Sequence, residues 1–296
     1  MRSRDSKTGR VVDSGRREFL RSAGGIVAAG ALLGSPALAL AAQRSRATGA
    51  RLGQLGLQLY TVRNLMDQDV DGTLAAVAAI GYREVELAGL HNKTATEMRA
   101  MLDRHGLRAR SSHSSMQDIR RTWSRTLDDA ATLGQTYIVN PWIDEPERTV
   151  AGYTKAAHEM TTAAGAARAH GIGFAFHNHD FEFARVGGKL GYDILLAESD
   201  PKLVKMELDI FWIVKGGQDP LAYFARHPGR FPMVHAKDIA KDGKMVDVGQ
   251  GTIDWREIFR HSRQAGIEYT FVEHDEPPSP IADARTSYEY LHALTF

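Results

Sequence analysis

From residue 55 onward, short apolar runs rich in β-forming residues alternate with segments whose apolar residues recur at helical spacing. The pattern predicts strands at Leu55–Val62, Arg83–Leu87, Leu107–His113, Tyr137–Trp142, Ile172–Phe176, Leu203–Met206, Phe231–Val234 and Tyr269–Phe271. It predicts helices at 72–80, 94–105, 153–170, 192–199, 220–226 and 255–265. One more helix is predicted between the third and fourth strands and ends at about Leu133. Gly106, Gly171 and Gly266 follow three of these helices, as glycines at helix ends commonly do. Strands too apolar to leave a face in water predict a closed parallel sheet, the (β/α)₈ TIM barrel of the α/β class.

The length fits one such barrel. The 255 residues that follow Ala41 are close to the roughly 250 typical of a single (β/α)₈ barrel, and no low-complexity linker divides them. We predict a catalytic barrel at residues 52–296, preceded by a flexible lead-in at residues 42–51.

The first 41 residues are predicted to be an export signal. Residues 14–21 read Ser-Gly-Arg-Arg-Glu-Phe-Leu-Arg, the core of a twin-arginine signal, and residues 22–42 carry no charge. Small residues up to Ala41 offer a cleavage site after Ala41 or Ala42. An uncleaved membrane anchor is the alternative, although glycines and Pro36 dilute the hydrophobicity of this run. The expectation is a periplasmic protein that meets the membrane only through its signal.

Composition excludes several classes of function. The chain has no cysteine, which removes disulfides, thiolate zinc sites and cysteine nucleophiles together. Without the seven basic and three acidic residues of the signal, the 37 basic and 36 acidic residues of the chain leave a net charge of −3. That balance gives no electrostatic case for binding nucleic acid. No nucleophile elbow, P-loop or dinucleotide fingerprint is present.

Four polar patterns close the last four predicted strands: HNHDFEF at 177–183, ELD at 207–209, HAKD at 235–238 and VEHD at 272–275. Their spacing is close to the roughly 30 residues of a βαβ unit, so all four fall at the same end of a barrel. Asp209, His235 and Glu273 are the predicted ligands of one divalent metal. Mn²⁺ is the first choice, with Mg²⁺, Co²⁺, Fe²⁺ and Zn²⁺ as alternatives. Taken singly, each residue is as well explained by a structural ion pair.

The fourth ligand comes from the HNHDFEF segment. Strand alternation places His177 and His179 on one face, so either histidine can complete the set. His177 is our preferred ligand, which leaves His179 to act on the substrate.

Further residues are candidates for catalysis or binding. Lys237 shares the face of His235 and can neutralise an enolate oxygen or pair with Glu207 or Glu273. Glu207 points one layer deeper into the barrel, where it can orient a ligand. Five residues near strand ends are candidate substrate contacts, each equally well explained by packing or structure: Glu86, His113, Trp142, Glu182 and Trp212.

A glycine pair, Gly249 and Gly251, follows the seventh strand. Barrels often hold a phosphate in loops of this region. The same pair can instead serve only to permit the turn, and Asp254 after it fits a helix cap.

These segments resemble the xylose isomerase-like TIM-barrel family of sugar phosphate isomerases and epimerases. The segments that carry the resemblance are LGLQLYTVR at 55–63, YREVELAGL at 82–90, HNHDFEF, ELDIFWIVKGG at 207–217, HAKDI at 235–239, VGQGTIDW at 248–255 and VEHD. The resemblance implies a divalent metal held by strands five to eight, here by Asp209, His235 and Glu273. In many members the strand-five ligand is a glutamate that works with the strand-eight glutamate as an acid–base pair. His177 stands at that position here, so Glu273 would need His177 or His179 as its counterpart.

The resemblance implies a sugar isomerase or epimerase that acts through an enediolate next to a carbonyl. It extends to lyases and dehydratases that act on inososes, 3-keto-sugars and 3-keto-glycosides, which is the alternative reading. Two remote alternatives are a non-catalytic sugar-binding barrel and an endonuclease IV-like repair enzyme. The expected partner is a small sugar or keto-glycoside, unphosphorylated because phosphorylated sugars are scarce outside the cytoplasm. Dimers or tetramers are common in the family, so a homo-oligomer is also expected.

Overall fold

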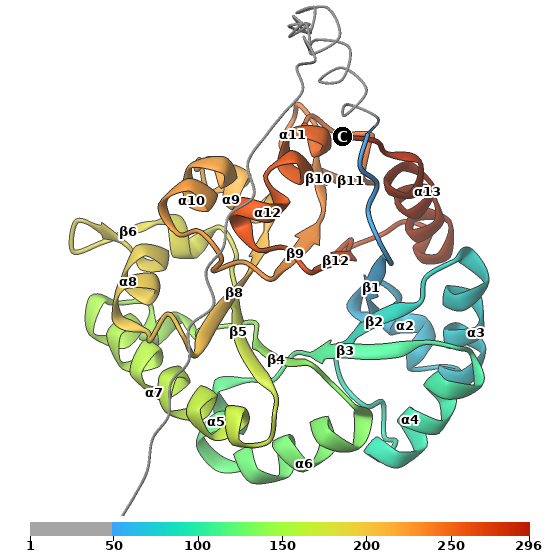
Figure 1. Ribbon diagram of the computed structural model, residues 1–296, viewed down its shortest axis with the longest axis horizontal. Helices are drawn as coiled ribbons and strands as arrows, with labels where there is room; N and C mark the ends of the chain where they lie inside the picture. Colours follow the sequence, from blue (N-terminus) through green and yellow to red (C-terminus); the bar gives the residue numbers. More distant parts are fainter. Residues whose placement is uncertain (1–48) are drawn as a thin grey trace, which may run out of the picture. The chain divides into compact units, whose positions relative to one another are not determined.

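Eight parallel strands form a ring in the order β3-β2-β1-β12-β9-β8-β5-β4 (Figure 1). The structure, a computed structural model, describes residues 49–296. The predicted signal at 1–41 and most of the lead-in lie outside the described residues. The strands are β1 Gly56–Gln58, β2 Glu84–Leu87, β3 Arg108–Ser112, β4 Tyr137–Asn140, β5 Gly173–His177, β8 Val204–Asp209, β9 Met233–Ala236 and β12 Tyr269–Val272.

The ring closes between β3 and β4. A single parallel bridge joins His113 to Val139, and the Ser114 backbone N–H donates to the Val139 carbonyl at 2.8 Å. At the other end of this seam, the Thr136 N–H donates to the Arg110 carbonyl at 2.8 Å. The predicted (β/α)₈ architecture is therefore confirmed.

Helices cover the outside of the ring (Figure 1). They include α3 Val70–Ile80, α4 Ala95–Arg104, α5 Met116–Arg121, α6 Trp123–Leu133, α7 Val150–Ala169, α8 Gly191–Glu198, α10 Pro220–Arg226, α11 Trp255–Arg260, α12 Ser262–Ala265 and α13 Pro280–Ala293. Their starts are encoded locally. Thr94 and Glu97 form a reciprocal capping box at α4, and Thr149 and Asp254 accept N-terminal N–H groups of α7 and α11. None of the described helices is long and apolar enough to cross a bilayer.

Several predicted boundaries were wrong. The first strand ends at Gln58, because the Gln58 side chain accepts from the Tyr60 N–H at 3.0 Å and begins a 3₁₀ helix, η1 Leu59–Val62. The strand predicted at Tyr137–Trp142 ends at Asn140. The helix predicted at 255–265 is divided at His261. The sequence pattern also missed several short elements. Among helices it did not predict α2 Arg63–Met66, α9 Ile210–Lys215, the terminal helix α13, or the 3₁₀ turns η2 Glu145–Glu147 and η3 Phe181–Phe183. It also did not predict two small hairpins, β6 Arg185–Val186 with β7 Lys189–Leu190 and β10 Asp238–Ile239 with β11 Met245–Val246.

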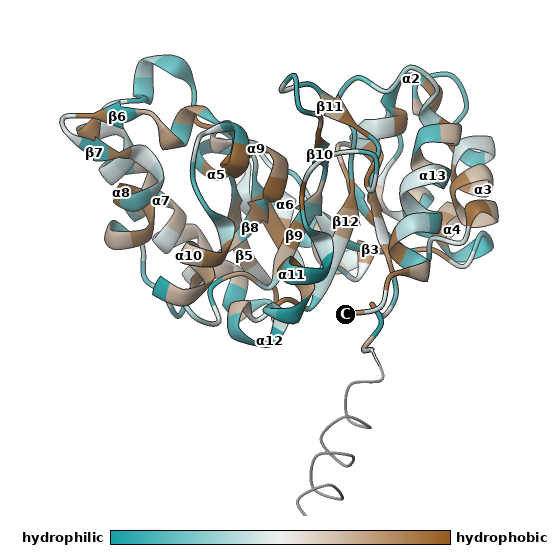
Figure 2. Cartoon of the chain, turned by 90° about the horizontal axis from the view of Figure 1, so that it is seen from above, coloured by the Kyte–Doolittle hydropathy of each residue, from teal (hydrophilic) through white to brown (hydrophobic). Residues whose placement is uncertain are grey.

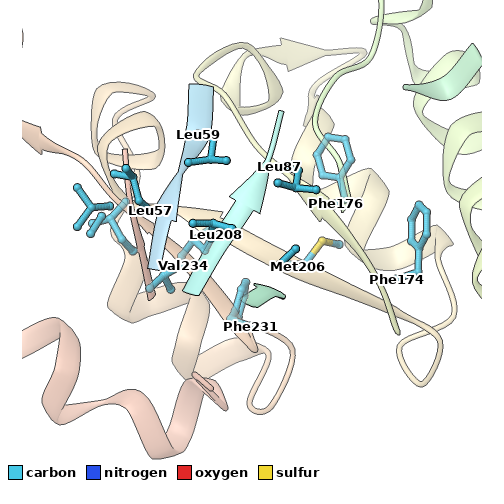
Figure 3. Packing of buried hydrophobic residues seen from close by; sticks show 14 of the residues in the cluster. Leu57, Leu59, Leu87, Phe174, Phe176, Met206, Leu208, Phe231 and Val234 are labelled. Atoms are coloured by element: carbon cyan, nitrogen blue, oxygen red, sulfur yellow. The ribbon is translucent and has the colours of Figure 1, made fainter. Parts of the chain in front are cut away.

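The core has two layers because side chains alternate along each strand. Leu57, Phe174, Leu208 and Val234 belong to the large cluster between sheet and helices (Figure 3). Hydrophobic colour follows β8, β9 and β12, with hydrophilic colour on outer helices and loops (Figure 2). The opposite strand faces fill the barrel interior with four side chains: Val139, Ala175, Met233 and Phe271. This apolar layer excludes water from below the polar residues that lie at the carboxyl ends of the strands.

Candidate functional site

The four predicted metal ligands meet at the carboxyl end of the barrel. His177 is the last residue of β5, Asp209 is the last of β8, His235 lies in β9, and Glu273 follows β12 directly. Asp209 and His235 are register partners. All four are buried, with at most 5% of the residue exposed. One ligand atom from each lies within 4.8 Å of the others.

The donor atoms fit a divalent metal. Asp209 Oδ2, His235 Nδ1 and Glu273 Oε2 are buried and make no well-directed hydrogen bond among the described residues, although the Lys237 ammonium lies 3.0 Å from Asp209 Oδ2 and 2.6 Å from Glu273 Oε2. Buried acceptors that converge without well-directed hydrogen bonds fit a cation bound among them, beside this ammonium. Two carboxylate oxygens and two imidazole nitrogens are ligands that Mn²⁺, Fe²⁺, Co²⁺ and Zn²⁺ accept.

The backbone around Asp209 fixes its carboxylate. Oδ1 accepts from the Trp212 N–H at 2.9 Å and caps α9, which leaves Oδ2 for the site. The Asn178 side chain accepts from the Asp209 N–H at 3.0 Å and donates to the Asp209 carbonyl at 3.3 Å. The residue between the two histidines of HNHDFEF therefore joins β5 to β8, a role that strand alternation alone did not identify.

Below the ligands lies a layer of hydrogen-bonded carboxylates and histidines. His235 Nε2 is 2.8 Å from Glu86 Oε1 and 3.2 Å from Glu207 Oε2. Since these carboxylates accept the Nε2 proton, the Nδ1 lone pair of His235 faces the site above. His177 is arranged similarly, with Nδ1 at 3.5 Å from Glu207 and Nε2 at 3.8 Å from Asp209 Oδ2. The predicted orienting role of Glu207 agrees with this geometry.

His113 completes this lower layer. Its Nε2 lies 2.9 Å from Glu86 and 3.3 Å from Glu207. Burial favours the neutral imidazole, but the charges of Glu86 and Glu207 outweigh burial and raise the pKa of His113 to about 9. His113, His177, Glu207 and His235 also lie close enough to hold a metal. Because they already bond to one another or to Glu86, we interpret them as the support of the upper site.

Lys237 lies among three carboxylates. Its Nζ is 2.6 Å from Glu273 Oε2, 2.7 Å from Asp275 Oδ1 and 3.0 Å from Asp209 Oδ2. Burial disfavours the ammonium, yet the charges of Asp209, Glu273 and Asp275 hold the pKa of Lys237 above its ordinary value. Lys237 therefore stays positively charged and can donate hydrogen bonds into the site. The sequence reasoning missed Asp275, although its place two residues after Glu273 was an available signal.

His179 lies beside the metal ligands without being buried among them. Its ring is centred 5.0 Å from that of His177, and its Nδ1 has no hydrogen-bond partner among the described residues. Burial and the positive charge of Lys237 lower the pKa of His179 to about 3. The imidazole is consequently neutral near pH 7 and able to accept a proton.

These groups open into one cavity of about 520 Å³, whose lining includes His113, His177, His179, Lys237, Glu273, Asp275, Trp142 and Trp212. Seven further lining residues were not candidates in the sequence: Tyr60, Arg63, Ala88, Pro141, Asp180, Phe181 and Glu276. A second cavity of about 490 Å³, lined in part by Glu84 and Tyr269, lies at the amino-terminal ends of the strands, away from the ligand set.

Two predicted substrate contacts need correction. Glu86 is fully buried below the ligands and does not line the cavity. Glu182 is also fully buried, and it accepts from the His179 backbone N–H at 2.7 Å. Both residues lie at the carboxyl end of the barrel, as predicted. Spacing along the sequence, however, does not indicate how deeply a side chain is buried below the cavity. Glu86 supports His235, and Glu182 supports the turn that presents His179.

The glycine loop after β9 binds a carboxylate of the chain itself. Asp238 is fully buried and accepts from the Gly249 N–H at 2.9 Å, the Ile253 N–H at 3.2 Å and Trp255 Nε1 at 2.9 Å. A Cβ on Gly251 would lie 2.0 Å from Asp238 Oδ1. Because Asp238 occupies the donors that a phosphate would need, the turn-forming interpretation of this loop holds and the phosphate interpretation does not.

Comparison with known proteins agrees with this fold and site. An inosose dehydratase from Lacticaseibacillus casei is 24% identical over 172 residues, 51% of this chain and 57% of that protein, so less than two thirds of that relative's length is covered. A sugar phosphate isomerase/epimerase from Parabacteroides distasonis is 26% identical with a TM-score of 0.74, covering 83% of this chain and 98% of that one. The 3-keto-D-glucoside 4-epimerase from E. coli, at 16% identity, a TM-score of 0.63 and coverage of 82% and 100%, shows likeness of fold alone. Residues 74–294 match the family described as xylose isomerase-like TIM barrel, and the chain belongs to that family.

Proposed function

We propose that this protein is a divalent-metal-dependent enzyme that removes the proton next to the carbonyl of a sugar. The observation that carries the proposal is the meeting, at one cavity, of a donor set that fits a metal, an uncharged histidine and a charged lysine. When bound, the metal would polarise the carbonyl and stabilise the enediolate that follows proton removal.

His179 is the base in this proposal. Its neutral ring lines the cavity, where a ring nitrogen can accept the proton. Glu273 is less suited to that task. Its Oε2 belongs to the ligand set and already lies 2.6 Å from Lys237 Nζ. Glu273 therefore acts as a ligand, and the site does not rely on a symmetric pair of glutamates.

Lys237 is the charge-stabilising group. Its ammonium lines the same cavity as His179 and is held there by Asp275. Three carboxylates hold the pKa of Lys237 above its ordinary value, so Nζ keeps its proton and can stabilise a negative oxygen by its charge and hydrogen bonds.

Two outcomes follow from the same first step. Return of the proton to carbon gives an isomer or epimer, the outcome that the breadth of the family and the likeness to the Parabacteroides isomerase/epimerase support. Loss of a β-substituent gives elimination, the second candidate. It is favoured by the similarity to an inosose dehydratase.

The deciding experiment combines elemental analysis of the purified protein with assays on ketohexoses and 3-keto-glucosides in the presence of Mn²⁺. The proposal expects about one metal per chain in the wild type and in His179→Gln, and its loss in Asp209→Ala. Activity should fall by about 10² or more in His179→Gln, as for other lost general bases. Interconverted ketohexoses would establish the isomerase, and release of the aglycone would establish the lyase. A metal-free wild type without turnover would refute both and leave a sugar-binding barrel.

We also propose export through the twin-arginine pathway, on the evidence of residues 14–21. Cell fractionation should find the chain in the periplasm. Replacing Arg16 and Arg17 by lysines should retain it in the cytoplasm, and unchanged localisation would contradict the proposal.

A further inference from the structure

The cavity above the candidate site is lined in part by the aromatic side chains of Tyr60 and Trp142, and we call this part of the cavity the mouth. Among the described residues, four large hydrophobic side chains are exposed: Tyr60, Trp142, Val150 and Tyr290. Two of them, Tyr60 at 42% and Trp142 at 43% exposure, line this same cavity. Exposed aromatic rings that converge on a concave site are more typical of a binding surface than of packing.

One side of the mouth is a wall of rings that begins at the candidate base. Phe181 stacks on His179 with ring centres 5.4 Å apart and planes 7° from parallel. Trp142 meets both rings edge-on, at 4.9 Å from Phe181 and 5.0 Å from His179. The Arg148 guanidinium lies 3.4 Å from the centre of the Phe181 ring and fixes it from behind. These contacts hold the three rings together in the absence of a ligand.

Tyr60 stands on another side. It follows β1, whereas Trp142 follows β4, and β2 and β3 lie between these strands in the ring. The Arg63 guanidinium covers the Tyr60 ring at 4.0 Å and donates to the Tyr60 carbonyl at 2.8 Å. The Tyr60 N–H donates to Gln58, which in turn donates to Glu86. Tyr60 is thus tied to the carboxylate layer that supports the site.

The charges around the cavity do not favour a phosphate. Of its two lysine and arginine side chains, Lys237 is paired with three carboxylates and Arg63 lies on Tyr60. Besides Glu273, three acidic side chains line the cavity: Asp180, Asp275 and Glu276. The ring of an uncharged ligand therefore suits a cavity lined by aromatic and acidic side chains better than an anion does.

We propose that the mouth is a second subsite that binds the ring of an aglycone, so that the substrate is an uncharged glycoside of a keto-sugar. The inference rests on the proposed function, because the inner sugar is the ring that carries the carbonyl. The inner ring lies among His179, Lys237 and the ligand set, and the outer ring lies between Trp142 and Tyr60. The aglycone ring can be aromatic or a second sugar, since both present a face that packs on indole or phenol.

A binding experiment tests the subsite independently of turnover. Titration calorimetry on the full, metal-loaded chain compares phenyl β-glucoside, cellobiose and methyl β-glucoside, none of which carries the ketone. We expect at least one ring-bearing glucoside to bind about tenfold more tightly than the methyl glucoside, the equivalent of one good aromatic contact. Preference for phenyl glucoside or for cellobiose identifies the kind of aglycone ring.

The ratio between ring-bearing and methyl glucosides is the readout for variants. It should fall toward one in Trp142→Ala and in Tyr60→Ala, and it should be largely restored in Trp142→Phe. Tyr290→Ala, which removes an equally exposed ring outside the cavity, should leave the ratio unchanged. Because the ratio compares two ligands on one protein sample, partial misfolding of a variant does not imitate the effect.

The results separate this inference from the proposed function. A wild type that turns over keto-sugars but shows no preference, or binds no glucoside, overturns the subsite and keeps the enzyme. A wild type that prefers ring-bearing glucosides but turns over neither ketohexoses nor 3-keto-glucosides keeps the subsite and overturns the enzyme. A ratio that Trp142→Ala and Tyr60→Ala leave intact overturns the subsite.

Discussion

Each of two site histidines connects two layers through its two ring nitrogens. His235 directs Nδ1 toward Asp209 and Glu273 and Nε2 toward Glu86 and Glu207. A single imidazole therefore has its tautomer set from below and its lone pair available above. Residues that never touch the metal or the substrate should consequently control how well the metal binds.

Replacement of Glu207 by glutamine tests this control. The amide keeps the size of the side chain but loses the charge that holds His235 and His177. We expect metal affinity to fall roughly 10- to 100-fold in Glu207→Gln, the usual cost of losing such a partner. Competition titration with a chromophoric chelator measures it.

Glu84→Gln is the matched control, because Glu84 is also buried but pairs with Arg110 at the opposite end of the barrel. Its metal affinity should equal that of the wild type. Equal losses in both variants would mean that general destabilisation, and not the support of His235, explains the result.

His113 should make the metal-free protein sensitive to alkali. Its pKa is raised from about 6.5 when unfolded to about 9 when folded. The stabilisation from its positive charge is therefore fully present below pH 6.5 and is lost as the pH rises through 9. In EDTA-treated protein we expect about 2–3 kcal/mol of this dependence to disappear in His113→Gln, as followed by urea unfolding at several pH values.

The control for this pH dependence is His158→Gln, which removes a histidine whose side chain is 64% exposed. It should leave the pH dependence as in the wild type. If His113→Gln shows the wild-type slope, the ion pairs of His113 with Glu86 and Glu207 do not stabilise the fold.

The sequence predicted which residues meet, but not how deep each lies. Asp209, His235 and Glu273 were identifiable because parallel strands end at the same edge, and a strand end can be read from where an apolar run stops. Glu86 and Glu182 fall at comparable positions, yet they turn inward to support histidines. Depth depends on the stagger between neighbouring strands, which no single strand encodes.

At the scale of elements, strands and long helices were predictable because their apolar periods are regular. The exceptions arise where one polar contact redirects the backbone. Gln58 ends β1 by bonding to the Tyr60 N–H, and Asp209 begins α9 by capping Trp212. After each contact the strand is followed by a helical turn instead of continuing. The turn places an aromatic side chain, Tyr60 or Trp212, at the cavity. These two irregular segments therefore contribute to the binding surface.

Close packing inside the barrel gives a prediction for β1. A Cβ on Gly56 would lie 2.3 Å from the Phe271 ring, so Gly56→Ala should destabilise the protein by about 1–3 kcal/mol in urea unfolding. Gly53→Ala is the control, since nothing lies within 4 Å of a Cβ there, and it should be nearly neutral. The double variant Gly56→Ala with Phe271→Leu should recover part of the loss. Additive losses would show that the ring of Phe271 is not the obstacle.

For the whole molecule, the ligand set draws on four of the eight strands. Because β5, β8, β9 and β12 each supply a ligand, a bound metal should stabilise the barrel as a unit. At 100 times its dissociation constant, free Mn²⁺ or Zn²⁺ should add about 2.7 kcal/mol to the free energy of unfolding. Thermal unfolding with and without metal measures the shift. Asp209→Ala should show almost none, and an equal shift in that variant would place the metal elsewhere.

The position of β12 bears on how the chain is made. This last strand pairs with β1 on one side and with β9 on the other, and it is followed at once by Glu273. Until residue 272 has left the ribosome, the edges of the first and seventh strands have no partner and present open backbone groups to other chains. A ribosome that stalls before this point releases a product that is prone to aggregate and cannot assemble the ligand set. Synthesis of the final strand therefore closes the barrel and completes the ligand set at the same time.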